Sequence, residues 1–268
     1  MSENKLSQNP SLNFNELLKA SIRLPVVKID RDTFLRTELE KRYDDETISR
    51  AIEYNPAYAN IPAAEIDLLA AESIKAETLR VSAISFAAGL PGGFALIGTI
   101  PADLTQYFGH MLRIMQKLVY LYGWHSLLDK NGELDSETTG LVTLFTGVMF
   151  GVNGANSAIA KIAVSAAKSI EKRVAAKALT KGTIYPIVKR VAASLGIKMT
   201  KTLFAKSVSK AVPVIGGITS GAITYATFRP MSEKLRKYLA SLPLASTSFY
   251  SSNEQLLSKD EDASGSML

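Results

Sequence analysis

The side chains best suited to chemistry lie close together in the middle of the chain. They recur three or four positions apart: Asp103, Gln106, His110, Arg113 and Lys117. On a helix, at about 100° per residue, they fall within roughly a quarter-turn of one another. A carboxylate, an imidazole and a guanidinium on one face could bind a headgroup or transfer protons. The same spacing is typical of a solvated face whose side chains contact one another a turn apart, and the sequence favours this second interpretation.

The helix that would carry this polar face runs from Pro101 to about Gly123, because proline suits the first position of a helix and glycine its end. Its opposite face is apolar and predicts a contact with the core: Leu104, Phe108, Met111, Leu112, Met115, Val119 and Tyr122. Asp103, near the start of the helix, also complements the helix dipole.

A second long helix is predicted before it, from about Ala63 to Ala88, ended by the glycines and proline of residues 89–93. An apolar stripe follows it at helical spacing: Ile66, Ala70, Ile74, Val81, Ile84 and Ala88. Glu77 lies within this stripe. Because a buried carboxylate is costly, we expect Glu77 to pair with a base or to face solvent rather than to act in catalysis.

Helix signals recur along the rest of the chain, whereas sustained alternation typical of strands does not occur. Asp30 or Asp32 can cap a helix over 33–43, Asp44 and Asp45 can open one over 46–54, and Asp135 or Ser136 can cap one over 138–150. Further helices are predicted over 156–180, 184–195, 199–211 and 218–240. The sequence therefore predicts an all-α fold, a bundle of roughly 8–10 helices.

Glycines within the apolar helices predict close packing, since Gly147 and Gly151, and Gly217 and Gly221, are each one helical turn apart. We expect one helical domain over residues 21–240. A flexible N-terminal segment over 1–20 should precede it, and a disordered tail rich in serine and acidic residues over 241–268 should follow.

The sequence lacks the usual catalytic signatures. It contains no phosphate-binding GxxxxGK[ST] loop, no GxGxxG, no GxSxG elbow and no HExxH. Cysteine is absent and only two histidines occur, which excludes disulfides and thiolate metal sites. We expect no catalytic residue, cofactor or metal site. The polar N-terminus lacks the basic and apolar run of a secretory signal, so a cytoplasmic location is expected.

Charge is concentrated in one block. Residues 161–210 hold 12 basic residues and one acidic residue, Glu171, whereas the whole chain has a net charge of +6. Such a block favours a polyanionic partner, although a solvated face balanced by the acidic first half is an equally open interpretation. Lys161, Lys168 and Lys172 align on one helical face beside an aliphatic face, as in helices that lie on anionic membranes. Few aromatic residues accompany the block, which argues against nucleic acid.

Three spans carry no charge, over residues 81–102, 138–160 and 211–228. A spanning helix needs about 20 predominantly apolar residues. Glycine and proline interrupt the first span, polar residues end the second, and the third is short. The sequence favours buried core helices, with helices that enter or cross a bilayer as alternatives.

The segment from Ile100 to Trp124, IPADLTQYFGHMLRIMQKLVYLYGW, resembles the signature of the EcsC family. The segment KAVPVIGG over 210–217, followed by a helix ending near 239, is similar to the family's late motif. The matching positions are Pro101, Asp103, Arg113, Tyr122, Gly123, Lys210, Pro213 and Gly216. The resemblance implies a helical bacterial protein related to one encoded beside an ABC-type transporter, and it implies no catalytic role for these residues.

Three functional hypotheses follow. The leading one is a non-enzymatic cytoplasmic protein bound peripherally to an anionic membrane, as an accessory to a transport or envelope system or to an ABC-type transporter, without a nucleic-acid partner. The second is an enzyme that processes a lipid or headgroup, with Asp103, His110 and Arg113 as its polar centre. The third is a soluble helical scaffold. The oligomeric state is left open.

Overall fold

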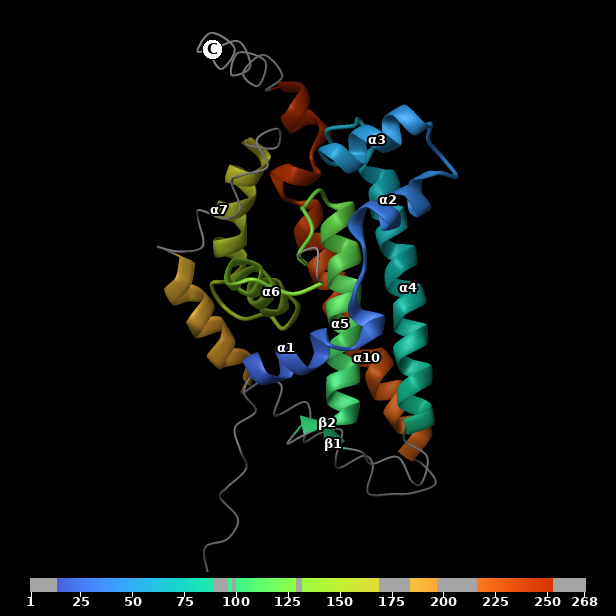
Figure 1. Cartoon of the computed structure of the whole chain (residues 1–268), viewed down its shortest axis with the longest axis vertical. Helices are drawn as coiled ribbons and strands as arrows, with labels where there is room; N and C mark the ends of the chain where they lie inside the picture. The colour runs from blue at the N-terminus through green and yellow to red at the C-terminus, as the bar shows by residue number, and fades with distance from the viewer. Residues whose placement is uncertain are drawn as a thin grey trace, which may run out of the picture.

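Three long helices form the centre of the molecule. The computed structural model describes residues 14–88, 96–97, 100–128, 132–168, 184–196 and 216–252. Within them α4 (Ala63–Ala88), α5 (Ala102–Leu121) and α10 (Gly216–Ala240) run along the long axis and contact one another (Figure 1). The predicted all-α helical bundle is confirmed. The described residues also contain a short antiparallel pair, β1 (Leu96–Ile97) with β2 (Ile100–Pro101), which is too short to show as alternation in the sequence.

Aspartate caps begin three of the shorter helices, and the structure decides between the capping residues that the sequence left open. Asp30 accepts a hydrogen bond from the Thr33 amide, 2.8 Å away, at the start of α2 (Arg31–Leu39). Asp44 accepts from the Thr47 amide at the start of α3 (Asp45–Glu53). Asp135 accepts from the Glu137 and Thr138 amides at the start of α6 (Ser136–Met149). The α2 helix ends four residues earlier than predicted, at Leu39.

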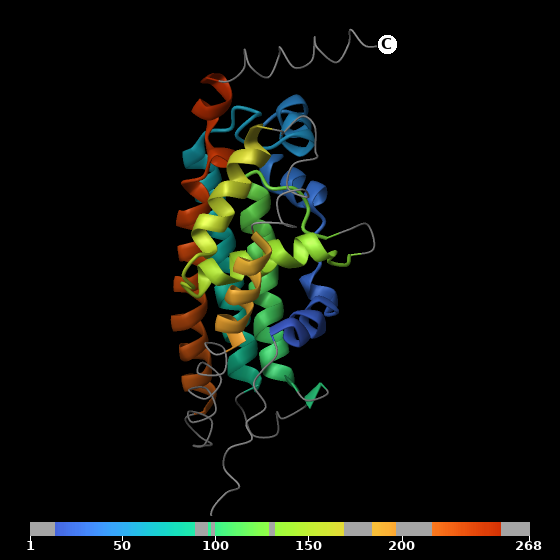
Figure 2. The same cartoon turned by 90° about the vertical axis from the view of Figure 1, so that its left-hand side faces the viewer.

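A second layer covers one side of the three long helices. The α6 helix crosses their direction, with α7 (Ala155–Lys168) and a helix over residues 184–196 on its outer side (Figure 2). Gly147 of α6 makes this crossing close, because a Cβ there would lie 2.6 Å from Val191 Cγ1 and 2.9 Å from Ala155 Cβ. The close packing predicted for the first glycine pair is therefore present at Gly147.

Both ends of the predicted domain lie further out than expected. The α1 helix (Phe14–Ile22) and the 3₁₀ helix η1 (Pro25–Val27) precede residue 30, and Phe14 packs edge-on against Phe108, with ring centroids 5.7 Å apart. The predicted flexible segment over 1–20 is thus wrong from residue 14 onward. Phe14, Leu17 and Leu18 form a buried helical stripe, which the polar average composition of the segment hides.

The predicted disordered tail over 241–268 is likewise wrong up to residue 252. After α10 come the 3₁₀ helix η3 (Pro243–Ala245) and a helix over 247–252. Leu242, Leu244 and Tyr250 are buried and attach this serine-rich segment to the core. The predicted helix over 199–211 and the end of the one over 156–180 lie outside the described residues.

Membrane crossing can be judged for the helices that the structure describes. None of them combines the length and the apolar character that a bilayer span requires.

Candidate functional site

A buried acid and a buried imidazole meet at the contact between α4 and α5. Glu77, on α4, is fully buried, and its Oε1 lies 2.6 Å from Nδ1 of His110 on α5, which is 2% exposed. Because an ionised carboxylate can only accept hydrogen bonds, Nδ1 carries a proton and donates a hydrogen bond to Glu77. The expectation that Glu77 pairs with a base is confirmed.

Two arginines complete the cluster around Glu77. Nε of Arg113 lies 3.3 Å, and Nη1 of Arg80 3.2 Å, from Glu77 Oε2. Arg113 also donates from Nη1 to the backbone oxygen of Val26 at 2.6 Å, which ties η1 to α5. Burial alone would raise the pKa of Glu77, but the hydrogen bond from His110 and the charges of His110, Arg113 and Arg80 hold it below its ordinary value of 4.5. Glu77 is therefore ionised at neutral pH.

The chemistry open to this cluster follows from the second nitrogen of the imidazole. In the neutral imidazole with its proton on Nδ1, Nε2 of His110 would carry a lone pair, and this nitrogen has no hydrogen-bond partner within the described residues. A carboxylate behind an imidazole is the arrangement that prepares a general base. Among the residues described, no group of three or more metal-binding side chains comes together.

Among the side chains that the structure describes, His110 and Arg113 of the polar face predicted on α5 converge on Glu77, and Lys117 does not pair with it. Lys117 lies over the ring of Phe34, with Nζ 5.6 Å from the ring centroid, and burial lowers the pKa of Lys117. Gln106 is half-buried, and the side chain of Asp103 lies outside the described residues. The interpretation as a solvated face does not hold at His110, because α4 and the N-terminal segment cover this side. The spacing places these residues on one face but contains no information on what packs against it.

Gln116 is a polar residue of α5 that the sequence analysis missed. It is buried, donates from Nε2 to the Val27 oxygen at 2.7 Å and accepts from the Ile29 amide at 3.3 Å. The only feature of the sequence that could have indicated this role is its position three residues after Arg113, close to the predicted polar face. Together, Arg113 and Gln116 hold the backbone of residues 26–29 against α5.

The family-like positions Tyr122 and Gly123 lie at the other end of α5. The Tyr122 hydroxyl donates to Asp67 Oδ1 at 2.8 Å, and Asp67 also forms an ion pair with Arg236 of α10. Burial and the adjacent Asp67 both raise the pKa of Tyr122. Gly123 has φ +90°, and a Cβ there would meet the Leu244 oxygen at 2.8 Å. Both positions therefore hold helices together.

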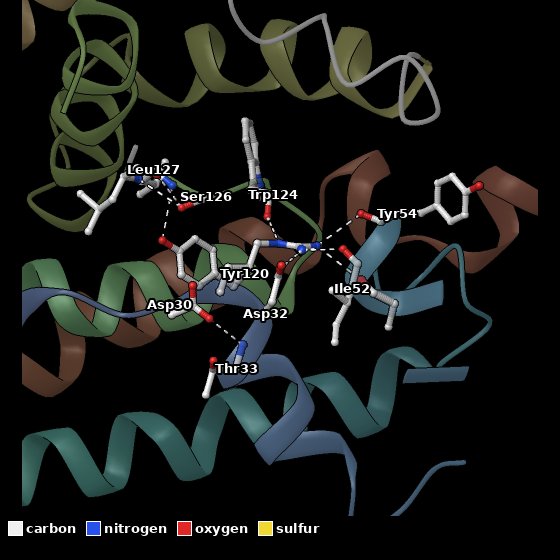
Figure 3. A network of polar contacts seen from close by, with 12 residues as sticks. Asp30, Asp32, Thr33, Ile52, Tyr54, Tyr120, Trp124, Ser126 and Leu127 are labelled. Carbon is white, nitrogen blue, oxygen red and sulfur yellow. Dashed lines mark hydrogen bonds and ion pairs between the residues drawn. The ribbon is translucent and has the colours of Figure 1, made fainter. Parts of the chain in front are cut away.

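Arg31, at the start of α2, forms a separate buried network that the sequence did not indicate. Its guanidinium donates to the backbone oxygens of Ile52 at 2.6 Å and of Trp124 at 3.1 Å, and to those of Ala51 and Tyr54 at 3.4 Å. Figure 3 shows the oxygens of Asp32, Ile52, Tyr54 and Trp124 directed at this group. The cation thus satisfies carbonyls at the C-terminal end of α3 and links α2, α3 and the end of α5.

The remaining predicted residues belong to a different surface or lie outside the described residues. Lys161 and Lys168 are exposed on α7. Gly216 begins α10 and Pro101 ends β2. The other three fall outside the described residues: Lys172, Lys210 and Pro213.

The fold and its buried contacts define an all-α bundle with a charge cluster in its core and a basic helix on its outside. Comparison with known protein families, with curated proteins and with solved structures finds no match for this chain.

Proposed function

We propose that this chain is a non-enzymatic cytoplasmic protein that binds an anionic membrane surface peripherally, with α7 as part of its contact surface. The two faces of α7 support this. Lys161, Val164 and Lys168 follow one another on the exposed face, at the spacing of one helical side. The opposite face is buried: Ala155, Ala158, Ile159, Ile162, Ala163 and Ala167.

Electrostatic attraction gives such a surface affinity for an anionic membrane. Each lysine near an anionic bilayer contributes about 1 kcal/mol, so a few of the 12 basic residues over 161–210 suffice for a measurable affinity. The attraction is screened beyond about 8 Å at physiological salt, so binding should weaken as salt rises. The resemblance to the EcsC family adds a proposed context, that of an accessory to an ABC-type transporter or another envelope system.

The experiment is sedimentation with vesicles of phosphatidylcholine alone, or mixed in equal parts with phosphatidylglycerol. Lys161→Glu combined with Lys168→Glu should reduce binding to the anionic vesicles. The matched control is Lys41→Glu with Lys75→Glu, which makes the same charge change at exposed lysines outside the basic block. The control should bind like the wild type if the position of the charge matters.

Two results would overturn the proposal. The first is absence of binding to anionic vesicles at low salt. The second is an equal loss in both variants, which would show an effect of net charge rather than of a surface on α7. Circular dichroism of each variant establishes that the fold is retained.

A second candidate function rests on the unpartnered Nε2 of His110. Held by Glu77, this imidazole could serve as the general base of an enzyme that processes a lipid or headgroup. Against it, the imidazole is almost fully buried, and Glu77 is occupied by His110, Arg113 and Arg80. Turnover of a phospholipid by the purified protein, abolished by His110→Ala at unchanged stability, would establish it. A helical scaffold is the third candidate, and it would neither bind the vesicles nor turn over a phospholipid.

A further inference from the structure

We propose that α7 and the helix over residues 184–196 form one platform from which Val164 and Tyr185 insert into the boundary between headgroups and acyl chains. This inference rests on the proposed membrane binding and adds a second, apolar component to it. It also extends the contact surface to a helix that the sequence analysis did not single out.

The two helices lie on the same side of the molecule. Both flank α6 on its outer side in two views a quarter-turn apart (Figures 1 and 2). Their packing on α6 and its neighbouring loop explains this: Val188 approaches Gly140 and Val191 approaches Gly147, while a Cβ at Gly154 would lie 3.6 Å from Ile187 Cγ2. Val191 and the inward residues of α7 are buried, so each helix is held by one face and leaves the other exposed.

Each outer face combines basic and apolar side chains. Val164 of α7 is 41% exposed between Lys161 and Lys168, and Tyr185 is 52% exposed beside the exposed Lys189 and Arg190. Lys189 Nζ lies 4.7 Å from the centroid of the Tyr185 ring. Neither residues 155–168 nor residues 184–196 contain an aspartate or glutamate. A surface that is basic and free of acids is complementary to an anionic bilayer.

The chemistry of these side chains points to the interfacial region of that bilayer. Tyrosine is enriched at this level because its ring is apolar and its hydroxyl polar. Lysine and arginine can remain at the headgroups while their aliphatic stems cover apolar surface. Basic and apolar residues on the same exposed faces are characteristic of helices that lie in the interface plane.

Insertion and charge attraction differ in their response to salt. Attraction between exposed charges is screened, whereas burial of apolar surface is not weakened by salt. The platform should therefore show a fraction of binding that persists at high NaCl concentration. Replacing both apolar side chains by serine should lower the binding constant at high salt on the order of tenfold.

The experiment compares two double variants on the phosphatidylcholine–phosphatidylglycerol vesicles. The test variant is Val164→Ser with Tyr185→Ser. The control is Leu68→Ser with Leu79→Ser, which removes two exposed leucines from α4, away from the platform. At high salt the test variant should dissociate and the control should stay bound.

A second readout does not depend on how well the serine variant folds. Tyr185→Trp introduces a fluorophore at the platform, and the only native tryptophan, Trp124, is buried. Vesicles with brominated acyl chains should quench the new fluorophore and leave wild-type fluorescence nearly unchanged.

The outcomes distinguish failure of insertion from failure of membrane binding itself. If anionic vesicles bind at low salt but high salt releases all protein and Trp at 185 is not quenched, insertion is wrong while membrane binding stands. If no vesicle binds at low salt, both proposals fail. If DNA of the same phosphate concentration competes the vesicles away, the basic surface serves nucleic acid and both proposals fail.

Discussion

Glu77→Gln tests what the buried cluster contributes to folding. The change removes the negative charge at the α4–α5 contact but keeps the size of the side chain and one oxygen that can accept from His110. It leaves His110 with a hydrogen bond to a neutral amide, and it leaves Arg113 and Arg80 without their buried counter-charge.

The magnitude depends on how much solvent reaches each partner. Arg80 is 52% exposed and Arg113 24% exposed, so water screens Arg80 strongly and Arg113 in part. The main loss is at His110, because a hydrogen bond to a charged group is worth about 1.5–3 kcal/mol against about 1 kcal/mol for a neutral one. With a smaller contribution from Arg113, we expect Glu77→Gln to lower the free energy of unfolding by about 2–3 kcal/mol at pH 7.

Urea unfolding measures this loss. Trp124 is the only tryptophan and is buried, so its fluorescence reports loss of the core, and circular dichroism at the same urea concentrations tests whether the transitions coincide. The control is Glu72→Gln, an exposed acid on the same helix, which should stay within about 0.5 kcal/mol of the wild type.

The dependence on pH separates charge from packing. The pKa of Glu77 is lowered in the folded protein, so the unfolded chain takes up a proton first as pH falls. The stabilisation by Glu77 is fully present above its ordinary pKa of 4.5 and is lost as pH falls through the lower folded value. The difference between wild type and Glu77→Gln should therefore shrink below pH 4.5. An unchanged difference in acid, or none at pH 7, would refute this account of the cluster.

Three further changes test other buried contacts. Gly123→Ala should lower the free energy of unfolding by about 2–4 kcal/mol, because φ is +90° and the added Cβ would overlap a carbonyl oxygen. Gly140→Ala lies inside α6, where the added Cβ would be 3.7 Å from Val188 Cγ2, an ordinary contact distance. This change should instead be neutral or stabilising by up to about 1 kcal/mol in the same urea assay. Arg31→Lys should cost about 1.5–3 kcal/mol, because one ammonium cannot reach the four carbonyls that the guanidinium contacts. Nitrogen NMR should find neutral His110 protonated at Nδ1, with the exposed His125 as internal reference; a proton on Nε2 would contradict the contact with Glu77.

Features that depend on neighbouring residues could be predicted from the sequence. The α4 helix has the predicted bounds, Ala63 to Ala88, because an apolar stripe and a glycine–proline break define it locally. The caps Asp30, Asp44 and Asp135 were among those named, since a cap acts on an amide two or three residues away.

Features that depend on distant residues could not. The guanidinium of Arg31 finds its acceptors about 20 residues and 93 residues along the chain, and Asn55 donates to Tyr250 at a separation of 195. Nothing near either residue indicates such a partner. The polar face of α5 was correctly placed on one side of a helix, but its burial depends on α4 and η1, whose approach no spacing rule contains. Glu77 could be expected to pair, but not specifically with His110.

The placement of the polar contacts between the three long helices suggests what they contribute to the fold. Apolar contact is not directional, so helices that meet through small and aliphatic residues can shift along one another at modest cost. Glu77 with His110 joins α4 to α5 near the middle of both helices. Asp67, near the start of α4, contacts Tyr122 just after the end of α5 and pairs with Arg236 of α10. Two polar contacts at separate points along the same helix pair favour the register in which both can form. Because α10 shares the second contact, the same constraint aligns the whole central layer on which α6 rests. The outer helices then occupy a defined position on the surface, as the proposed platform requires.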